Sequence, residues 1–372
     1  MKILISGGHL TPALALCDYL QQAQPDWKIL FVGRTFSQDT AQQKAHEQNE
    51  VAKRGLPFFA LQAPRLSGDS WWEKIQRSSQ FVASVSRALK IISQEKPSVF
   101  VSFGGYLAVP IALAAWLKGV PIVTHEQTRR PGRANLFIAR LAQKIAISFP
   151  ETASVFPSHK VVVTGNLLRP ELFKLQHPAF GDIKKQNDLP LLYVTGGNQG
   201  AKVLNDVIAD GLPELIKTWR IIHQCGNATK DHDYLTQLQA RKETLTTEEK
   251  ARYVIREWFT TEELALIYSQ ATIVLSRAGA NTVYELAAVK VPSILVPLPT
   301  AYQDEQQANA EWLVKLGGAK LLPQSELNQE NLIKVLTMIK ETTPQMTAAL
   351  EKLQIPLDAT AQLTDVLKTY QS

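Results

Sequence analysis

The chain has 372 residues, enough for two domains with separate cores, and its composition is that of a globular protein. Its two cysteines, Cys17 and Cys225, are too few for a disulfide framework, which favours a reducing compartment. The longest apolar run, Tyr106 to Leu117, is too short to span a bilayer, so we expect no transmembrane helix. Residues 1–165 carry 19 Lys and Arg against 10 Asp and Glu, and the remainder carries 21 against 24. The basic half indicates an anionic ligand or surface, unless the charge serves solubility alone.

A short apolar strand, a glycine corner and a helical pattern recur along the chain. The first case is a strand before Gly7-Gly8 with a helix near residues 11–22, and the second is a strand over 98–101 before Gly104-Gly105. The stretches "PLLYVTGGNQGAKVLNDVI" and "ATIVLSRAGANTVYELAAVK" repeat this order in the second half. Further strand-like runs are "WKILFVG", "VPIVTHE", "KIAISF", "KVVVTG", "RIIHQCG" and "PSILVPL". Strands that alternate with helices predict an α/β chain with two Rossmann-like, doubly wound parallel-sheet domains.

Glycine corners between a parallel strand and a helix are suited to phosphate groups. The first N–H groups of a helix are unpaired and partially positive, and glycine lets an anion approach the backbone. A tight turn alone also favours glycine, but four such corners in two domains favour two phosphorylated ligands. No G-x-G-x-x-G follows the first strand and no G-x-x-x-x-G-K-[ST] occurs, which argues against a dinucleotide dehydrogenase and a phosphate-loop NTPase.

Several of these segments together resemble one enzyme family. The segments, in chain order, are "GGHLTPALAL", "FGGYLAVPIALAAW", "VPIVTHEQ", "VTGNLLR", "VTGGNQGAKVLN", "SRAGANTVYELAAVKVPSILVPLP" and "DEQQANAEWL". They are similar to the MurG family of glycosyltransferases, which form lipid II for peptidoglycan, and so serve cell wall biogenesis, cell shape and cell division. The resemblance runs from residue 7 to about residue 320.

The resemblance implies a GT-B fold, in which two Rossmann-like domains face each other across a cleft. Residues 1–165, joined by a C-terminal helix at about 355–372, would bind the acceptor and face the membrane, and residues 166–350 would bind UDP-GlcNAc. The implied reaction is inverting transfer of GlcNAc from UDP-GlcNAc to the C4 hydroxyl of undecaprenyl-pyrophosphoryl-MurNAc-pentapeptide (lipid I).

The resemblance also indicates the donor site. Glu285, one turn into a helix, would accept the ribose hydroxyls, while the start of that helix faces the diphosphate. Arg169 and Arg277 would stabilise phosphate charge, unless Arg277 serves a structural ion pair. The glutamines Gln306 and Gln307 would contact the donor sugar, unless they form a polar helix face. The other residues expected at the donor site are Gly197, Asn198, Gln199, Phe259, Ala280, Asn281 and Thr282.

The acceptor site and the general base are expected in the first half. His9 stands at the first corner, where its imidazole can take a hydroxyl proton near neutral pH, unless it only bonds the backbone. His125 and Glu126, at the end of another strand, are rivals for the same proton, and the sequence leaves the choice open. The expected acceptor-binding residues are Ser6, Gly7, Gly8, Gly104, Gly105, Tyr106 and Asn135.

The chain departs from the family pattern in two places. The first loop usually reads G-G-T-G-G-H, whereas here Leu4-Ile5-Ser6 precedes Gly7-Gly8-His9, so we expect the acceptor diphosphate site to be reshaped. The asparagine that usually closes the H-E-Q-N block is replaced by Thr128, and the basic residues Arg129, Arg130 and Arg133 follow it. Those arginines are suited to a diphosphate or to anionic lipid.

Residues 66–92 combine aromatic and basic side chains, as interfacial helices do. Trp71, Trp72 and Phe81 stand among Lys74, Arg77, Arg87 and Lys90. Because the implied acceptor is anchored in lipid, we expect this helix to contact an anionic membrane at its cytoplasmic face, peripherally. The alternative is an ordinary domain helix with its apolar face in the core, and both can hold.

We expect no fixed metal or cofactor, although magnesium can be stimulatory. Asp231-His232-Asp233 resembles a D-x-D manganese motif, but it lies in a polar loop away from every glycine corner. The alternatives in other classes are another UDP-sugar-dependent glycolipid glycosyltransferase, a UDP-GlcNAc 2-epimerase, and a non-catalytic basic module. We expect no nucleic-acid partner, since neither a reading helix nor a stacking-aromatic motif is present.

Overall fold

The protein divides into two compact units, each with its own parallel sheet. A computed structural model describes residues 1–34, 46–64, 71–173, 189–197, 200–227 and 232–371, with the backbone only for residues 46, 71–77 and 302. Unit 1 comprises Met1–Leu168 and Pro356–Ser372, and unit 2 comprises Arg169–Ile355. The C-terminal segment therefore belongs to the same unit as the N-terminus.

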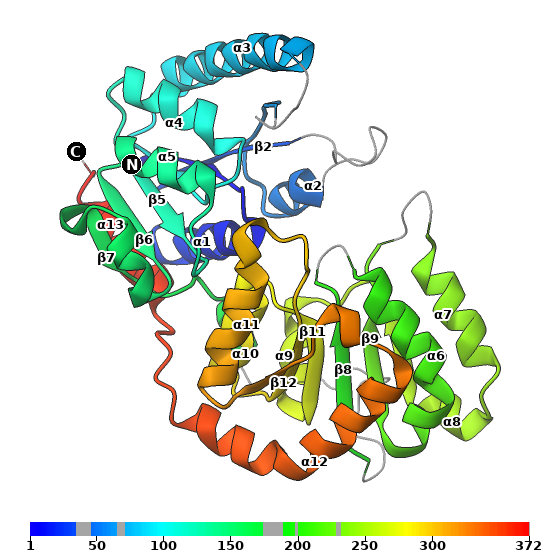
Figure 1. Cartoon of the computed structure of the whole chain (residues 1–372). Helices are drawn as coiled ribbons and strands as arrows, with labels where there is room; N and C mark the ends of the chain where they lie inside the picture. Colours follow the sequence, from blue (N-terminus) through cyan, green and yellow to red (C-terminus); the bar gives the residue numbers. More distant parts are fainter. Residues whose placement is uncertain (35–45, 65–70, 174–188, 198–199, 228–231, 372) are drawn as a thin grey trace. The chain divides into compact units, whose positions relative to one another are not determined.

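Unit 1 is built on a seven-stranded parallel sheet in the order β3-β2-β1-β4-β5-β6-β7. Figure 1 labels β2, β5, β6 and β7 among these strands. Because β1 pairs with both β2 and β4, the strand order reverses beside β1, which is the place where open α/β sheets bind ligands. The strands are β1 (Lys2–Ser6), β2 (Lys28–Gly33), β3 (Phe58–Ala60), β4 (Val99–Ser102), β5 (Ile122–Glu126), β6 (Lys144–Ile147) and β7 (Val161–Val163). The α-helices are α1 (Leu10–Ala23), α2 (His46–Lys53), α3 (Trp71–Glu95), α4 (Ala108–Leu117), α5 (Arg133–Leu141) and α13 (Ala359–Lys368).

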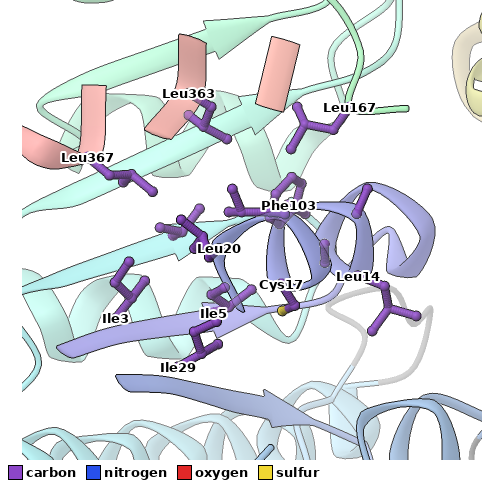
Figure 2. Packing of buried hydrophobic residues seen from close by; sticks show 14 of the residues in the cluster. Ile3, Ile5, Leu14, Cys17, Leu20, Ile29, Phe103, Leu167, Leu363 and Leu367 are labelled. Carbon is purple, nitrogen blue, oxygen red and sulfur yellow. The ribbon is translucent and has the colours of Figure 1, made fainter. Parts of the chain in front are cut away.

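The two faces of this sheet carry separate hydrophobic clusters, as the alternation of side chains along a strand requires. On β1, Ile3 and Ile5 join the cluster with α1 and α13, whereas Leu4 joins the cluster with α3, α4 and α5. Figure 2 shows the first cluster, in which Leu363 and Leu367 of α13 lie over residues of α1 and the sheet. The C-terminal helix is therefore part of the core of unit 1.

Unit 2 is built on a six-stranded parallel sheet in the order β10-β9-β8-β11-β12-β13. Its order reverses beside β8, which pairs with both β9 and β11. The strands are β8 (Leu191–Thr195), β9 (Arg220–Gln224), β10 (Tyr253–Arg256), β11 (Ile273–Arg277), β12 (Ser293–Val296) and β13 (Ala319–Leu321). The α-helices are α6 (Lys202–Thr218), α7 (Tyr234–Glu243), α8 (Thr247–Ala251), α9 (Thr261–Gln270), α10 (Ala280–Ala288), α11 (Glu305–Lys315) and α12 (Gln329–Glu351).

The expected fold class is confirmed, because both sheets are parallel and helices follow their strands in sequence. The four glycine corners follow β1, β4, β8 and β11, the central strands at the two places where strand order reverses. The strands β3, β10 and β13 were not among the runs expected from the sequence. All three are edge strands, of only three or four residues. The short 3-10 helices are η1 (Pro150–Val155), η2 (Ser158–Lys160), η3 (Pro170–Phe173), η4 (Tyr302–Asp304) and η5 (Gln324–Glu326).

Candidate functional site

The two glycine corners of unit 1 touch each other. A Cβ atom on Gly8 would lie 1.9 Å from the carbonyl oxygen of Gly104, and one on Gly105 would lie 2.9 Å from the Cα of Gly8. Gly104 and Gly105 also have φ of +74° and +76°, a conformation that L side chains rarely adopt. Glycine is therefore required at Gly8 and Gly105 because the two backbones approach too closely for a Cβ, and at Gly104 and Gly105 because φ is positive. The structure therefore brings the glycines expected at the acceptor site together, at the carboxyl ends of β1 and β4.

His9 immediately precedes α1 and is held at one ring nitrogen. Its Nδ1 lies 3.0 Å from the carbonyl oxygen of Phe103 and 2.5 Å from Nε2 of Gln127. A carbonyl oxygen only accepts hydrogen bonds, so Nδ1 carries the hydrogen in the neutral ring. The lone pair is then on Nε2. This tautomer equips His9 to accept a proton at Nε2.

His125 lies in the interior of unit 1. It is completely buried, and its Nε2 donates to the carbonyl oxygen of Gly165 at 3.1 Å. Burial lowers the pKa of His125 to about 4, although the hydrogen bond with Gly165 and the neighbouring side chain of Gln127 oppose the shift, while the nearby His9 adds to it. His125 is therefore neutral at physiological pH and lies away from solvent.

Glu126 is the centre of a buried polar cluster. Its carboxylate accepts hydrogen bonds from the backbone and hydroxyl of Thr128 at 2.9 and 2.6 Å, from Asn135 at 2.8 Å and from the backbone of Gly132 at 3.3 Å. Asn135 in turn lies against the second corner, since a Cβ on Gly104 would meet its Nδ2 at 3.0 Å. Glu126 thus orders the segment that supports the corner, and Thr128 is part of that network.

Two residues that the sequence did not single out lie beside the first corner. Glu47 is 6% exposed, and its Oε2 accepts a hydrogen bond from the backbone N–H of Arg34 at 3.1 Å. A Cβ on Gly7 would lie 2.9 Å from Oε1 of Glu47. Arg34 donates to the Tyr106 hydroxyl at 3.2 Å, and its guanidinium lies over the Tyr106 ring. Burial raises the pKa of Glu47 to about 7, against the opposing effect of Arg34. Arg34 thus places a cation next to the glycine corners.

In unit 2 the corner after β8 is also closely packed. Gly197 and Gly200 have φ of +75° and +70°. A Cβ on Gly200 would lie 2.2 Å from the carbonyl oxygen of Cys225, whereas one on Gly197 would meet nothing within 4 Å. Gly197 therefore leaves open space where a ligand can approach the backbone. Asn198 and Gln199, expected here, lie outside the described residues.

Glu285 and Arg169, both expected at the donor site, form an ion pair. Nη2 of Arg169 lies 3.1 Å from Oε1 and 3.3 Å from Oε2 of Glu285, while its Nη1 donates to the hydroxyl of Thr261 at 3.1 Å. Glu285 is 5% exposed. Burial opposes the charge of Arg169, but the carboxylate outweighs it and holds the arginine pKa above its ordinary value. Glu285 is thus presented as a carboxylate near the start of α10.

Ala280, Asn281 and Thr282 form the first turn of α10, after the cap residue Gly279. Arg277, at the end of β11, donates to the carbonyl oxygens of Val296 and Pro297 at 3.2 and 3.4 Å. It therefore supports the backbone after β12, and no ion pair of Arg277 is recorded among the described residues.

The two glutamines of α11 make local contacts. Oε1 of Gln306 accepts from the backbone of Leu298 at 3.0 Å, and Gln307 donates to Glu311 at 2.9 Å. Asn309, completely buried, donates to the carbonyl oxygen of Ala278 at 3.2 Å and ties α11 to the corner after β11. Phe259 is buried, with the guanidinium of Arg256 over its ring.

Among the described residues, no cluster of three or more His, Cys, Asp or Glu side chains is arranged to hold a metal ion. Asp233 of the D-x-D-like stretch caps α7, because its carboxylate accepts from the backbone of Thr236. Asp231 lies outside the described residues. This stretch therefore contributes a helix cap.

The helix α3 has one face in the core of unit 1. Ser84, Ala88, Ile91 and Ile92 are buried, whereas Val82 is 67% exposed and Arg87 and Lys90 are exposed. The side chains of residues 71–77, including both tryptophans, lie outside the described part. Over the part of the chain that the structure describes, no helix has both the length and the apolar character needed to span a membrane.

Comparison with known proteins identifies the family. Residues 6–147 match the glycosyltransferase family 28 N-terminal domain, and residues 191–366 match the glycosyltransferase family 28 C-terminal domain. The chain is 34% identical over 370 residues to the UDP-N-acetylglucosamine–N-acetylmuramyl-(pentapeptide) pyrophosphoryl-undecaprenol N-acetylglucosamine transferase of Shewanella violacea, covering 97% of this chain and 93% of that one. A relative of the same name from Acinetobacter baumannii is 33% identical, with 90% and 86% covered.

Solved structures agree with this assignment. The crystal structure of Acinetobacter baumannii MurG superimposes with a TM-score of 0.69 and 27% identity, covering 99% of both chains. The UDP-GlcNAc 2-epimerase from Neisseria meningitidis superimposes with a TM-score of 0.66 but at 16% identity, which shows a shared fold alone. The resemblance seen in the sequence motifs is thereby confirmed, and the chain belongs to the MurG family of GT-B glycosyltransferases.

Proposed function

We propose that the protein transfers GlcNAc from UDP-GlcNAc to the C4 hydroxyl of undecaprenyl-pyrophosphoryl-MurNAc-pentapeptide, with inversion, to form lipid II. The observation that carries the proposal is the similarity over nearly the whole chain to enzymes named for this transfer. The glycine corners agree with it, because each unit offers a place where a diphosphate can approach backbone N–H groups at a helix start.

Among the three candidate bases, the contacts favour His9. His125 already uses Nε2 to donate to Gly165 and is completely buried, and Glu126 accepts four hydrogen bonds within the protein. His9 is only partly buried, and no partner of its Nε2 is recorded among the described residues. General base catalysis contributes about 10²- to 10⁴-fold to such reactions. We therefore assign the proton transfer to His9 and a supporting role to the other two.

The donor is assigned to unit 2. The Glu285 carboxylate has two oxygens and about four acceptor positions, of which Arg169 occupies one edge. The remaining positions suit the two ribose hydroxyls, and the first turn of α10 suits the diphosphate. We assign Arg169 the support of Glu285, and the direct diphosphate contact that the sequence resemblance implied stays a prediction.

Membrane contact belongs to the same proposal, because a polyprenyl chain stays in the bilayer. The exposed Arg87 and Lys90 beside Val82 on α3 suit an anionic surface, and we place the protein peripherally at the cytoplasmic face of the membrane. Cosedimentation with vesicles tests this assignment. Anionic vesicles should retain the protein and neutral vesicles should not, and equal retention would contradict it.

The experiment for the activity uses radiolabelled UDP-GlcNAc and a short-chain lipid I analogue. Formation of a disaccharide lipid supports the proposal. Transfer to another glycolipid would select the broader glycosyltransferase alternative, and release of ManNAc would select the epimerase. His9→Gln should lower kcat by about 10²-fold or more while the KM for UDP-GlcNAc stays the same. A variant with unchanged kcat would exclude His9 as the base.

A further inference from the structure

The contacts around Gln127 contain a conflict between hydrogen-bond donors. Nδ1 of His9 already donates to the carbonyl oxygen of Phe103 at 3.0 Å, yet Nε2 of Gln127 lies 2.5 Å from the same Nδ1. An amide nitrogen and a protonated ring nitrogen are both donors, so they cannot bond each other. The amide must therefore direct its oxygen to His9.

Two unpaired buried atoms agree with that reversal. With nitrogen toward His9, Oε1 of Gln127 and Nδ1 of His125 have no hydrogen-bond partner within the described part of the chain, although both residues are completely buried. The Gln127 side chain is within interaction range of the His125 ring. Because Nε2 of His125 donates to Gly165, Nδ1 of that ring holds a lone pair and needs a donor. Leaving a buried polar group unpaired costs its full desolvation penalty, so an orientation that satisfies both atoms is strongly favoured.

When the oxygen and nitrogen of the Gln127 amide exchange places, every polar group from Gly165 through His125 and Gln127 to His9 has a hydrogen-bond partner. The Gly165 carbonyl accepts from His125 Nε2–H, and His125 Nδ1 accepts from the Gln127 amide N–H. The Gln127 oxygen, together with the Phe103 carbonyl, then accepts from His9 Nδ1–H. Each hydrogen bond fixes the orientation of the next group, and the series ends at His9, whose Nε2 carries the lone pair.

We propose that Gln127 is a positioning residue, whose amide, held by the neutral His125, fixes His9 in the Nδ1–H tautomer and so keeps Nε2 ready to accept the proton of the acceptor hydroxyl. This inference rests on the proposed function only for the identity of the reaction. The tautomer itself is a property of the protein without substrate.

The first test reads the tautomer directly in the full-length protein. With ¹⁵N-labelled histidine, two-bond ¹⁵N–¹H correlation spectra distinguish Nδ1–H from Nε2–H, and His9→Gln identifies the His9 signals by their loss. We expect neutral His9 as the Nδ1–H form in the wild type. An Nε2–H form would overturn the inference, whether or not the protein makes lipid II.

The second test removes the amide while keeping the side-chain length. Gln127→Met leaves the Phe103 carbonyl as the one recorded acceptor for His9 Nδ1–H, so the share of the Nε2–H form should rise above that of the wild type. The kcat should fall by about tenfold or more, with the KM for UDP-GlcNAc unchanged. Gln22→Met, at an exposed glutamine of α1, is the matched control and should change neither. A folded Gln127→Met protein with an unaltered His9 tautomer would refute the inference. If this variant does not fold, the wild-type spectrum still decides. Failure of the wild type to form lipid II would instead refute the proposed function.

Discussion

The buried histidine of unit 2 makes a quantitative prediction about acid stability. His223 on β9 is completely buried, with Nε2 at 2.9 Å from Oδ1 of Asn205 and Nδ1 at 2.9 Å from the hydroxyl of Tyr253. The amide oxygen accepts, so Nε2 carries the hydrogen and Nδ1 accepts from the tyrosine. The neutral ring is thus fully bonded. Burial lowers the pKa of His223 from 6.5 to about 3.

The direction of the effect follows from proton binding. Between pH 6.5 and about 3 the unfolded chain carries a proton on this residue and the folded chain does not. The unfolded state therefore gains stability as the pH falls, and the contribution of the neutral ring, complete above pH 6.5, is progressively lost. At pH 4.5, two pH units below the unfolded pKa, the loss is about 3 kcal/mol at about 1.4 kcal/mol per unit.

The assay compares urea unfolding of the wild type and His223→Gln at pH 7.5 and 4.5. Glutamine has both a donor and an acceptor but does not titrate. The wild type should lose about 3 kcal/mol more than the variant between these pH values, because all other groups are shared. His159→Gln, at an exposed histidine, is the control and should behave as the wild type. Equal losses for the wild type and His223→Gln would refute the reasoning.

Three further predictions concern the cysteines, the corners and the donor site. Burial raises the pKa of the Cys17 and Cys225 thiols, the latter to about 11. Neither thiol should therefore react with a thiol reagent at pH 8 until guanidinium unfolds the chain. Fast labelling of the native protein would contradict this prediction. Gly8→Ala should destabilise unit 1 by about 2 kcal/mol or more in urea unfolding, because the new methyl group would overlap the Gly104 carbonyl. The control Gly279→Ala, where φ is −63° and the added Cβ would meet no described atom, should change the free energy of unfolding by less than about 1 kcal/mol. Equal losses for the two variants would show that the corner after β1 tolerates a side chain. Glu285→Ala should raise the KM for UDP-GlcNAc by about 10- to 100-fold, the value of one or two charged hydrogen bonds; an unchanged KM would place the ribose elsewhere.

The central strands and glycine corners were predictable because their signals are local. A β-branched run, two glycines and a helical period describe β1 with Gly7-Gly8 without any knowledge of distant residues. The edge strands β3, β10 and β13 were missed for a related reason. An edge strand has a single neighbour and is partly exposed, so it does not need the continuous apolar run that marks a buried parallel strand.

The partners of the site residues were not predictable in the same way. Gln127 and His9 are separated by 118 positions, and Arg169 and Glu285 by 116. No pattern of spacing encodes such pairs. Glu47 gave no signal at all, because a glutamate in the first turn of a helix is common on a protein surface. Only the fold places its carboxyl beside Gly7.

The end of β5 nevertheless contained a signal that physical reasoning can use. Four consecutive polar residues there are at most 1% exposed, namely Thr124, His125, Glu126 and Gln127. Side chains alternate along a strand, so Thr124 and Glu126 share one face and His125 and Gln127 the other. The contacts agree with this division, since Asn135 bonds the first pair whereas Gln127 contacts His9. Four polar groups can remain buried only if each finds a partner. A polar tetrad at the end of an apolar strand therefore indicates two separate networks, one that supports the corner after β4 and one that contacts His9.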